Sequence, residues 1–203
     1  MRRMVVSVST RQRILDTALE SFGTAGVAET SLDALARSLD LRKQSILYYF
    51  NSKAELVDAV VDEAADRFIS ELDTLSDRVD PTDVWSQLEG AVRVVFRLAV
   101  QEPALLGLVR EASRPGSTVA LRLSTRLSQQ IGAAQHSLDI ALKEGRVQGE
   151  NSRLLLFSLY STIMGVATEV EVLRAMGIEP SLRSLAQRRQ ELLRFLRVAL
   201  NPL

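Results

Sequence analysis

The chain of 203 residues contains no cysteine and a single histidine, His136. Without cysteine it can form neither disulfides nor thiolate metal sites, and it has no thiol nucleophile, which suits a reducing cytosol. One histidine argues against histidine-rich metal sites and against most histidine-based catalysis. The sequence also lacks a glycine-rich phosphate loop, a metal-ligand cluster and a nucleophile elbow. These absences predict a protein that is not an enzyme and that holds no cofactor and no metal.

Long apolar runs are missing as well. The longest uncharged apolar run, from Leu154 to Thr168, has fifteen residues, which is too short to cross a bilayer. The N-terminal stretch "MRRMVVSVST" has no apolar segment long enough for a secretory signal. We therefore expect a cytoplasmic protein without a membrane partner.

The formal net charge is zero, but the charge is unevenly distributed. Residues 1–54 hold eight Arg and Lys against five Asp and Glu, a net of +3, whereas the remaining 149 residues hold 17 against 20, a net of −3. The chain has only three lysines, and two of them, Lys43 and Lys53, lie within residues 41–56. This asymmetry indicates an anionic partner for the N-terminal end.

The apolar residues follow helical spacing along the chain. The chain is 46% hydrophobic, enough for a sizeable core, and no segment alternates apolar and polar residues as a half-buried strand would. Apolar residues instead recur at i, i+3, i+4 and i+7, the spacing of an amphipathic helix. The pattern predicts an all-α protein of about nine helices, over residues 10–23, 32–39, 42–50, 52–78, 81–102, 103–113, 117–144, 152–176 and 181–200.

Local signals mark the ends of the N-terminal helices. Gly26 follows the first helix, in a position to end it with a left-handed residue. Thr30 is placed to cap the second helix, and Asp33, three residues on, can complete a capping box. Asp40 follows the second helix. Because aspartate tolerates left-handed geometry better than most residues, we expect a tight turn there.

The segment "LRKQSILYYFNSKAEL", residues 41–56, comes directly after this turn. On a helical wheel at about 100° per residue, the apolar residues Ile46, Leu47 and Phe50 fall on one side. The opposite side carries Gln44, Ser45, Tyr48 and Tyr49. Two short helices joined by a tight turn, the second with a polar outer face, describe a helix-turn-helix. Its second helix can enter the major groove of DNA.

The chemistry of this outer face suits contact with double-stranded DNA. Gln44 can donate and accept together, as a bidentate contact with adenine requires. Hydroxyls and cations can reach phosphate oxygens, and Lys53 lies at a helix start, where the macrodipole also favours an anion. The candidate DNA-binding residues are Thr30, Ser31, Arg42, Lys43, Gln44, Ser45, Tyr48, Tyr49 and Lys53. The plainer alternative is that these side chains form only a solvated helix face.

Residues 10–60, "TRQRILDTALESFGTAGVAETSLDALARSLDLRKQSILYYFNSKAELVDAV", contain three short motifs in order: "T-R-x-R-I-L-D-x-A", "T-S" and "L-Y-Y-F-x-S-K-x-x-L". This stretch, about a quarter of the chain, resembles the N-terminal domain of the tetracycline-repressor (TetR) family of bacterial transcriptional regulators. The resemblance implies a helix-turn-helix DNA-binding domain at residues 1–54. It also implies a larger helical domain at residues 55–203 for effector binding and dimerisation.

Four positions depart from the usual pattern of that family. Asp40 stands where the family usually has glycine, and Gln44 stands where it often has glycine or another small residue. Leu47 occupies the place of the first of two usual tyrosines, and Tyr49 the place of a usual histidine. These departures bear on which bases are read rather than on the mode of binding.

The C-terminal two-thirds suggest an effector pocket. The helix expected over residues 152–176 has one aliphatic face and one face of aromatic, sulfur and polar character. A mixed face of this kind favours a pocket for a small, largely apolar molecule, with plain core packing as the alternative for each residue. The candidate lining residues are Trp85, Val92, Phe96, Phe157, Tyr160 and Met164. His136 lies nearly opposite the apolar stripe of its helix, so we expect it at the surface.

Apolar stripes on the last two helices suggest a homodimer. The family resemblance implies that these two helices pair with their copies in a four-helix interface. The candidate interface residues are Leu159, Ile163, Val166, Leu185, Leu192 and Leu196. The alternative is that both stripes belong only to the core of a single chain.

Together these patterns predict a ligand-responsive transcriptional regulator, most simply a repressor that a small apolar effector releases from its operator. Its expected partners are double-stranded operator DNA, the effector and a second copy of the chain. Two alternatives stay open. One is a DNA-binding regulator controlled by a protein partner, and the other is a helical enzyme whose N-terminal helices serve only for docking.

Overall fold

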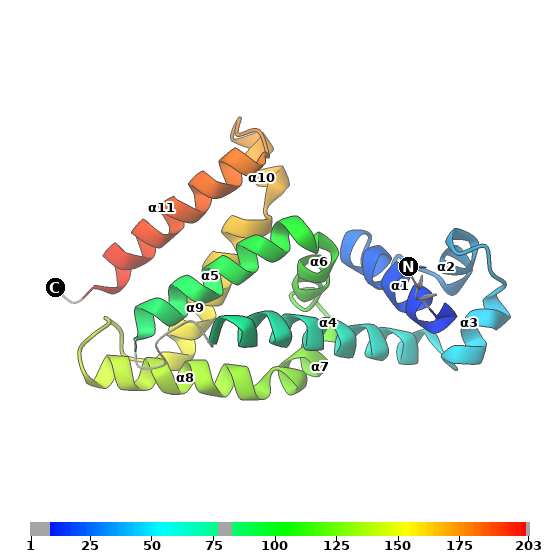
Figure 1. Cartoon of the computed structure of the whole chain (residues 1–203), viewed down its shortest axis with the longest axis horizontal. Helices are drawn as coiled ribbons and strands as arrows, with labels where there is room; N and C mark the ends of the chain where they lie inside the picture. Colours follow the sequence, from blue (N-terminus) through cyan, green and yellow to red (C-terminus); the bar gives the residue numbers. More distant parts are fainter. Residues whose placement is uncertain (1–8, 77–82, 202–203) are drawn as a thin grey trace, which may run out of the picture. The chain divides into compact units, whose positions relative to one another are not determined.

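The computed structural model describes residues 9–76 and 83–201, and within these ranges it contains helices and no strand. The predicted all-α class is confirmed. Figure 1 shows the helices in chain order. They are α1 (Thr10–Thr24), α2 (Leu32–Ser38), α3 (Lys43–Tyr49), α4 (Lys53–Ser76), α5 (Val84–Gln101), α6 (Pro103–Glu111), α7 (Val119–Arg126), α8 (Ser128–Lys143), α9 (Ser152–Thr168), α10 (Val170–Ala175) and α11 (Leu182–Leu200).

The described helices exceed the expected nine because two long helices are interrupted. The helix expected over 117–144 breaks at Leu127, whose φ of −92° and ψ of 9° leave the α-helical region. The helix expected over 152–176 breaks at Glu169, with φ −79° and ψ 66°. The two interruptions were not predicted, because the apolar spacing continues across both breaks and neither residue adjoins a proline or glycine.

The break between α9 and α10 is held by the last helix. Arg188 of α11 donates through Nη1 to the carbonyl oxygen of Val166, which a continuous helix would use for the N–H of Val170. Burial lowers the pKa of the Arg188 guanidinium. A carbonyl released by the interruption is therefore satisfied by a side chain, as a buried polar group requires.

The described residues form two compact units. The N-terminal unit comprises the residues up to Asp66 together with Pro103–Arg126, and the C-terminal unit comprises Arg67–Glu102 and the residues from Leu127 onward. Helix α4 contributes to both. The N-terminal unit extends beyond residue 54, because it also includes the first part of α4 and the whole of α6 and α7. The functional domain boundary expected after residue 54 stays a prediction.

The core of the N-terminal unit grows from one stripe of α1. The buried residues of α1 recur at the predicted helical spacing and face the inner sides of α2 and α3. These three helices lie together in Figure 1. These buried residues are Ile14, Leu15, Ala18, Leu19, Phe22, Leu35, Ala36, Ile46 and Phe50. Burying each large apolar side chain contributes about 1.5–3 kcal/mol. The stripe therefore fixes which face of α3 points inward.

In the C-terminal unit, α5 lies against α8, α9 and α11, and α9 also packs against α8 and α11. Helix α5 is apolar on most of its circumference, which suits a helix covered on several sides. The buried residues on these helices include Val92, Val94, Phe96, Leu98, Leu138, Leu159, Ile163, Leu192, Leu196 and Leu200. A backbone hydrogen bond also joins the loop between α8 and α9 to the end of α11, since the N–H of Gln148 donates to the carbonyl of Leu200 at 2.8 Å.

Candidate nucleic-acid interface

The turn between α2 and α3 is set by a residue in the left-handed region. Asp40 has φ of 55°, which confirms the expected tight turn. The N–H of Leu41 donates to the carbonyl of Ala36 at 2.8 Å, and the N–H of Asp40 to that of Arg37 at 3.2 Å. This pair of hydrogen bonds is the Schellman motif that ends many helices, usually with glycine at the left-handed position.

The start of α2 differs from the prediction in its capping residue. Ser31, not Thr30, is the N-cap, and its hydroxyl accepts from the N–H of Ala34 at 3.1 Å. Thr30 is only 5% exposed, and its hydroxyl donates to the carbonyl of Gly26 at 2.8 Å. Asp33 forms an ion pair with Lys43 at 2.8 Å. The expected capping box was therefore wrong, and only the backbone of Thr30 stays a candidate for a phosphate contact.

The sides of α3 are divided as the helical wheel predicted. Ile46 and Phe50, the residue directly after α3, are buried. Gln44 is exposed and Ser45 is half-buried. Tyr48 is 83% exposed. A large aromatic side chain this exposed gains nothing from the core of its own chain, so the outer face of α3 is available to a partner.

The two tyrosines of α3 support each other. Their rings are in an edge-to-face arrangement with centroids 5.1 Å apart and planes at 86°. Such a pair contributes about 0.5–1.5 kcal/mol beyond the area it buries. The contact restrains both rings, so the hydroxyls of Tyr48 and Tyr49 are presented with less freedom than isolated exposed side chains would have.

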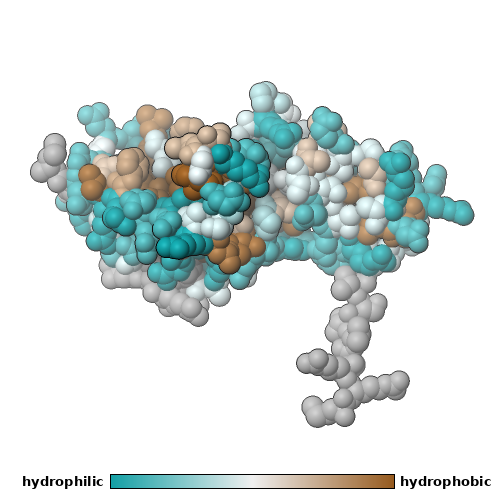
Figure 2. Space-filling model, turned by 90° about the horizontal axis from the view of Figure 1, so that it is seen from above, coloured by the Kyte–Doolittle hydropathy of each residue, from teal (hydrophilic) through white to brown (hydrophobic). Residues whose placement is uncertain are grey.

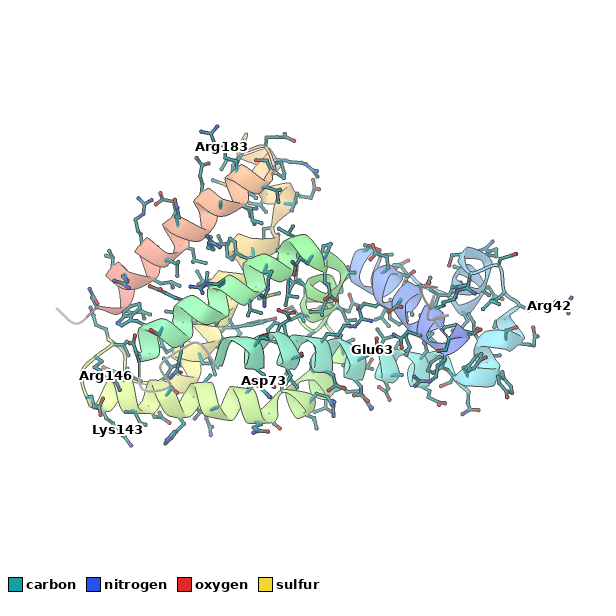
Figure 3. All side chains as sticks on the ribbon, viewed as in Figure 1. Arg42, Glu63, Asp73, Lys143, Arg146 and Arg183 are labelled. Atoms are coloured by element: carbon teal, nitrogen blue, oxygen red, sulfur yellow. The ribbon has the colours of Figure 1, made fainter. Side chains whose placement is uncertain are left out.

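The cations lie around this face. Arg42 is the N-cap of α3 without a side-chain capping hydrogen bond, and Figure 3 shows it at the outer edge of the N-terminal unit. Lys43 is paired with Asp33, and both are partly exposed, so this pair contributes little stability and can be exchanged for a phosphate contact. Lys53, the first residue of α4, donates through Nζ to the carbonyl of Ala28 at 3.4 Å.

Ser52 caps the start of α4. Its hydroxyl accepts from the N–H of Glu55 at 3.1 Å. The Glu55 carboxylate turns back to accept from the backbone N–H of Asn51 at 2.9 Å and from the Asn51 side-chain amide at 2.8 Å. These bonds fix the chain between α3 and α4, so Lys53 is held at a defined place relative to the tyrosines.

The residues expected to line an effector pocket are not all brought together. Val92, Phe96 and Met164 are buried in the C-terminal unit, but Phe157 is 64% and Tyr160 39% exposed. Trp85 is half-buried. Its ring lies 5.7 Å from the guanidinium carbon of Arg197 on α11. His136 is exposed, as expected.

The residues expected at a dimer interface lie largely inside the single chain. Leu159, Ile163, Leu192 and Leu196 are all buried, while Val166 and Leu185 are half-buried. The four buried residues have little surface left for a partner. Their apolar stripes serve the packing of α9 and α11 with α5, which is the alternative that the sequence left open.

A different set of apolar residues is exposed on the last three helices and at Met176, directly after α10. Phe157, predicted to line the pocket, belongs to this set. Exposed hydrophobic residues, brown in Figure 2, lie between hydrophilic ones over α10 and α11. The set consists of Leu154, Phe157, Tyr160, Val172, Met176, Leu182, Phe195 and Val198. Its α9 members could have been found from the sequence, because α9 carries no charged residue after Arg153.

Within residues 9–76 and 83–201 no group of three or more histidine, aspartate or glutamate side chains is placed to hold a metal ion. Among the same residues, no helix has the length and apolar character needed to cross a membrane.

Residues 14–60 match the family model described as "Bacterial regulatory proteins, tetR family". The chain is 42% identical over 52 residues to the HTH-type transcriptional regulator SrpR of Pseudomonas putida. That match covers 26% of this chain and 24% of SrpR, so the chain spans about a quarter of the length of this curated relative. Residues 14–60 include most of α1, the whole of α2 and α3 and the first part of α4.

Solved structures share the fold over most of the chain. AibR, in a complex with isovaleryl coenzyme A and operator DNA, superimposes with a TM-score of 0.70 at 18% identity, covering 92% of this chain and 97% of AibR. FadR from Bacillus subtilis, in a complex with stearoyl-CoA, gives a TM-score of 0.72 at 16% identity over 92% of this chain and 97% of FadR. At such identities the likeness concerns the fold.

Proposed function

Since residues 14–60 of this chain match the model of the tetR family of bacterial regulatory proteins, we propose that the chain is a DNA-binding transcriptional regulator of this family. In its simplest form it is a repressor that a small-molecule effector releases from its operator. The observation that carries this proposal is the outer face of α3. It presents Gln44, Tyr48 and Tyr49 to solvent, on a helix anchored from behind by Ile46 and Phe50.

In this proposal α3 enters the major groove and Gln44 contacts a base edge. The hydroxyls of Tyr48 and Tyr49 and the cations Arg42, Lys43 and Lys53 contact phosphates on either side. Ser45 allows close approach, and the backbone at Thr30 and Ser31 meets a phosphate at the start of α2. Phosphate contacts set position and affinity, while base contacts set sequence preference.

A selection experiment tests this proposal directly. The purified protein is used to enrich duplexes from a random pool, and the affinity of the enriched sequence is compared with that of a scrambled duplex. A DNA-binding regulator is expected to bind the enriched sequence about 10³-fold or more tightly at physiological salt. Failure to enrich any sequence, or equal affinity for both duplexes, would contradict a sequence-specific regulator.

We place effector binding in the C-terminal unit. Among the side chains that the structure describes, Arg97 Nε, Gln130 Oε1 and Arg188 Nε of this unit are buried without a hydrogen-bond partner. Arg97 is paired with Glu71 through another of its nitrogens. Buried polar atoms are normally satisfied, so a largely apolar guest with a polar end would remove these deficits. Val92, Phe96 and Met164 are buried in the same unit, and we propose them as the apolar lining for this guest.

The neighbours AibR and FadR carry acyl-CoA ligands, which makes isovaleryl-CoA and stearoyl-CoA suitable first probes. A ligand that binds only the folded chain raises its melting temperature, and at 100 times its Kd it adds about 2.7 kcal/mol. By reciprocity, an effector that weakens operator binding must itself bind more weakly to the operator complex by the same factor. Calorimetric titration with and without operator tests this coupling, and equal affinities would contradict it.

We also propose that the chain is a homodimer and that the exposed apolar set on α9 and α11 forms the interface. On α9, Leu154, Phe157, Ser161 and Gly165 share one face at helical spacing, and this face carries no charge. Phe195 and Val198 are exposed on α11. Exposed apolar side chains grouped on one helix face favour association. In a symmetric dimer the two α3 helices would lie about 34–36 Å apart and read a near-palindromic operator.

A further inference from the structure

Among the residues that the structure describes, Glu111 is the buried one that carries a charge. It is the last residue of α6 and is 7% exposed. Its carboxylate pairs with Arg114 Nε at 3.0 Å and accepts from the backbone N–H of Val27 at 3.4 Å. A buried carboxylate is costly unless it is paired and hydrogen-bonded. Glu111 therefore depends on its contacts with Arg114 and with the loop after α1.

Helix α6 touches α1 backbone to backbone. A Cβ added at Gly23 would lie 2.0 Å from the carbonyl oxygen of Ala104, and one added at Gly107 would lie 2.0 Å from the carbonyl oxygen of Gly23. Ala104, Gly107 and Glu111 are spaced at i, i+3 and i+7, so they share one face of α6. The face that carries Glu111 is therefore pressed against the helix that leads into the helix-turn-helix.

The loop between α1 and α2 is shaped around the Glu111–Arg114 pair. Gly26 has φ of 98°, and a Cβ there would lie 2.5 Å from Arg114 Nη1 and 3.3 Å from Glu111 Oε2. Glycine lets the loop lie directly on the ion pair and adopts this φ without strain. The next N–H, that of Val27, then donates to the carboxylate.

The same loop reaches the DNA-binding face. The carbonyl of Ala28 accepts from Lys53 Nζ at 3.4 Å, and Thr30 closes the loop by donating to the carbonyl of Gly26 at 2.8 Å. Ser31, which follows directly, caps α2. One carboxylate on α6 therefore restrains a loop that contacts a proposed phosphate-binding lysine and leads into α2.

We propose that Glu111 is a positioning residue for DNA binding: it fixes the loop of residues 26–30 and through it the side chain of Lys53 and the start of α2. This inference rests on the proposed DNA-binding function and adds a residue of α6 that does not face DNA. It also predicts a change in DNA affinity opposite to the change expected from charge alone. Removing an acid makes the chain more positive, which by charge alone strengthens DNA binding, whereas loss of positioning weakens it.

Two variants separate reach from charge. Glu111→Asp keeps the charge but shortens the side chain, so it loses the hydrogen bond from the Val27 N–H. Glu111→Gln keeps the reach and an acceptor oxygen but loses the charge. We expect Glu111→Asp to bind a random duplex about tenfold more weakly than wild type and Glu111→Gln to bind about threefold more weakly, in line with loss of a charge-assisted hydrogen bond. The control Glu20→Gln makes the same charge change at an exposed site of α1 and is expected to bind at least as tightly as wild type.

Amide hydrogen exchange without DNA supplies the second readout. Exchange at Val27, Ala28 and Glu29 is expected to accelerate in Glu111→Asp and to be unchanged in Glu20→Gln. Wild-type affinity in Glu111→Asp, tighter binding by Glu111→Gln, or unchanged exchange at Val27 would each overturn the proposal. If wild type itself binds no duplex, the proposed function fails along with this role of Glu111, while faster exchange at Val27 still establishes the loop contact.

Discussion

At the scale of single residues, the outer face of α3 separates sequence preference from affinity. Gln44 is an exposed amide on that face, and its donor and acceptor match the edge of adenine. Tyr48 is 83% exposed, and its hydroxyl is suited to a hydrogen bond with a phosphate oxygen. Because phosphates are the same at every base pair, the two side chains have different expected effects on specific and random DNA.

The first prediction concerns these two side chains. Gln44→Ala is expected to cost about 1–3 kcal/mol on the selected operator and nothing on a scrambled duplex, because it removes a base contact. Tyr48→Phe is expected to weaken binding to both duplexes equally. Fluorescence anisotropy with the two labelled duplexes measures both effects. Equal losses for Gln44→Ala on the two duplexes would contradict a base contact.

The second prediction concerns Asp40, which has φ of 55°. A left-handed L-residue is disfavoured by about 1–2 kcal/mol, and aspartate tolerates this geometry better than alanine does. We expect Asp40→Gly to raise the free energy of unfolding by up to about 1 kcal/mol and Asp40→Ala to lower it by a similar amount. Urea unfolding at neutral pH measures both. Shifts in the same direction would mean that something other than the backbone conformation decides the stability at this turn.

Some residue roles could be predicted from the sequence and others could not. The turn at Asp40 and the outward side chains of α3 follow from local periodicity and backbone preference. The cap of α2 did not, because Thr30 and Ser31 are adjacent hydroxyl residues with similar capping preferences. The choice between them depends on the contact of Thr30 with Gly26, which exists only once the loop has folded.

At the scale of helices, an ionic ladder joins α4 to α7 within the N-terminal unit. Asp58, Asp62 and Asp66 are spaced four residues apart on α4, and Arg122 and Arg126 are spaced likewise on α7. Arg122 makes two hydrogen bonds to the Asp62 carboxylate, at 2.9 and 2.6 Å, and pairs with Asp58 at 3.1 Å. Arg126 pairs with Asp66. A bidentate contact within a network of charges is worth more than isolated surface pairs.

The third prediction is the pH dependence of this ladder. The hydrogen bond from Arg122 holds the pKa of Asp62 below its ordinary value of 3.8. The stabilisation is therefore complete above that value and is lost as pH falls through the lower pKa of the folded state. Asp62→Asn is expected to lower the unfolding free energy at pH 7 by about 1 kcal/mol, since partial exposure screens the pair. The difference from wild type is expected to shrink below about pH 4.

Urea unfolding of wild type and Asp62→Asn between pH 7 and pH 3 measures this difference. Glu20→Gln, which removes an exposed acid of α1, serves as the control and is expected to show little difference from wild type at either pH. A difference for Asp62→Asn that grows as the pH falls would contradict the assigned direction of the pKa shift.

Helix existence could be predicted from the sequence more fully than helix continuity. Every described helix lies within a segment where helical spacing was found, because that spacing follows from burying one face. The interruptions at Leu127 and Glu169 have no local signal. The ladder between α4 and α7 joins residues about 60 apart, and charge spacing on one helix does not reveal which other helix will face it.

At the scale of the whole molecule, the proposed dimer depends on side chains that the single chain leaves uncovered. Phe157 and Val198 are 64% and 80% exposed, whereas Leu192 is 3% exposed. The sequence could predict that α9 and α11 carry apolar stripes. It could not predict which stripe meets α5, because a helical wheel gives the angle between faces and not their neighbours.

The fourth prediction separates the two kinds of stripe. Phe157→Glu is expected to give a monomer with wild-type helicity and weakened operator binding, because it places a charge on the proposed interface. Leu192→Glu is expected to unfold or strongly destabilise the chain, because it buries an unpaired charge. Light scattering after gel filtration and circular dichroism measure mass and helicity. If Phe157→Glu gives a folded dimer, the face of α9 that carries Phe157 is not part of the interface.

The central claim is that the N-terminal domain binds DNA through α3 and the start of α4. The most direct test is the salt dependence of DNA affinity in wild type, Lys53→Ala and the control Lys143→Ala. The control removes a lysine from an exposed position at the end of α8, labelled in Figure 3. If Lys53 neutralises one phosphate, Lys53→Ala is expected to reduce the slope of log affinity against log salt by about 0.9, while Lys143→Ala leaves it unchanged. A slope for Lys53→Ala equal to that of wild type would contradict the proposed interface.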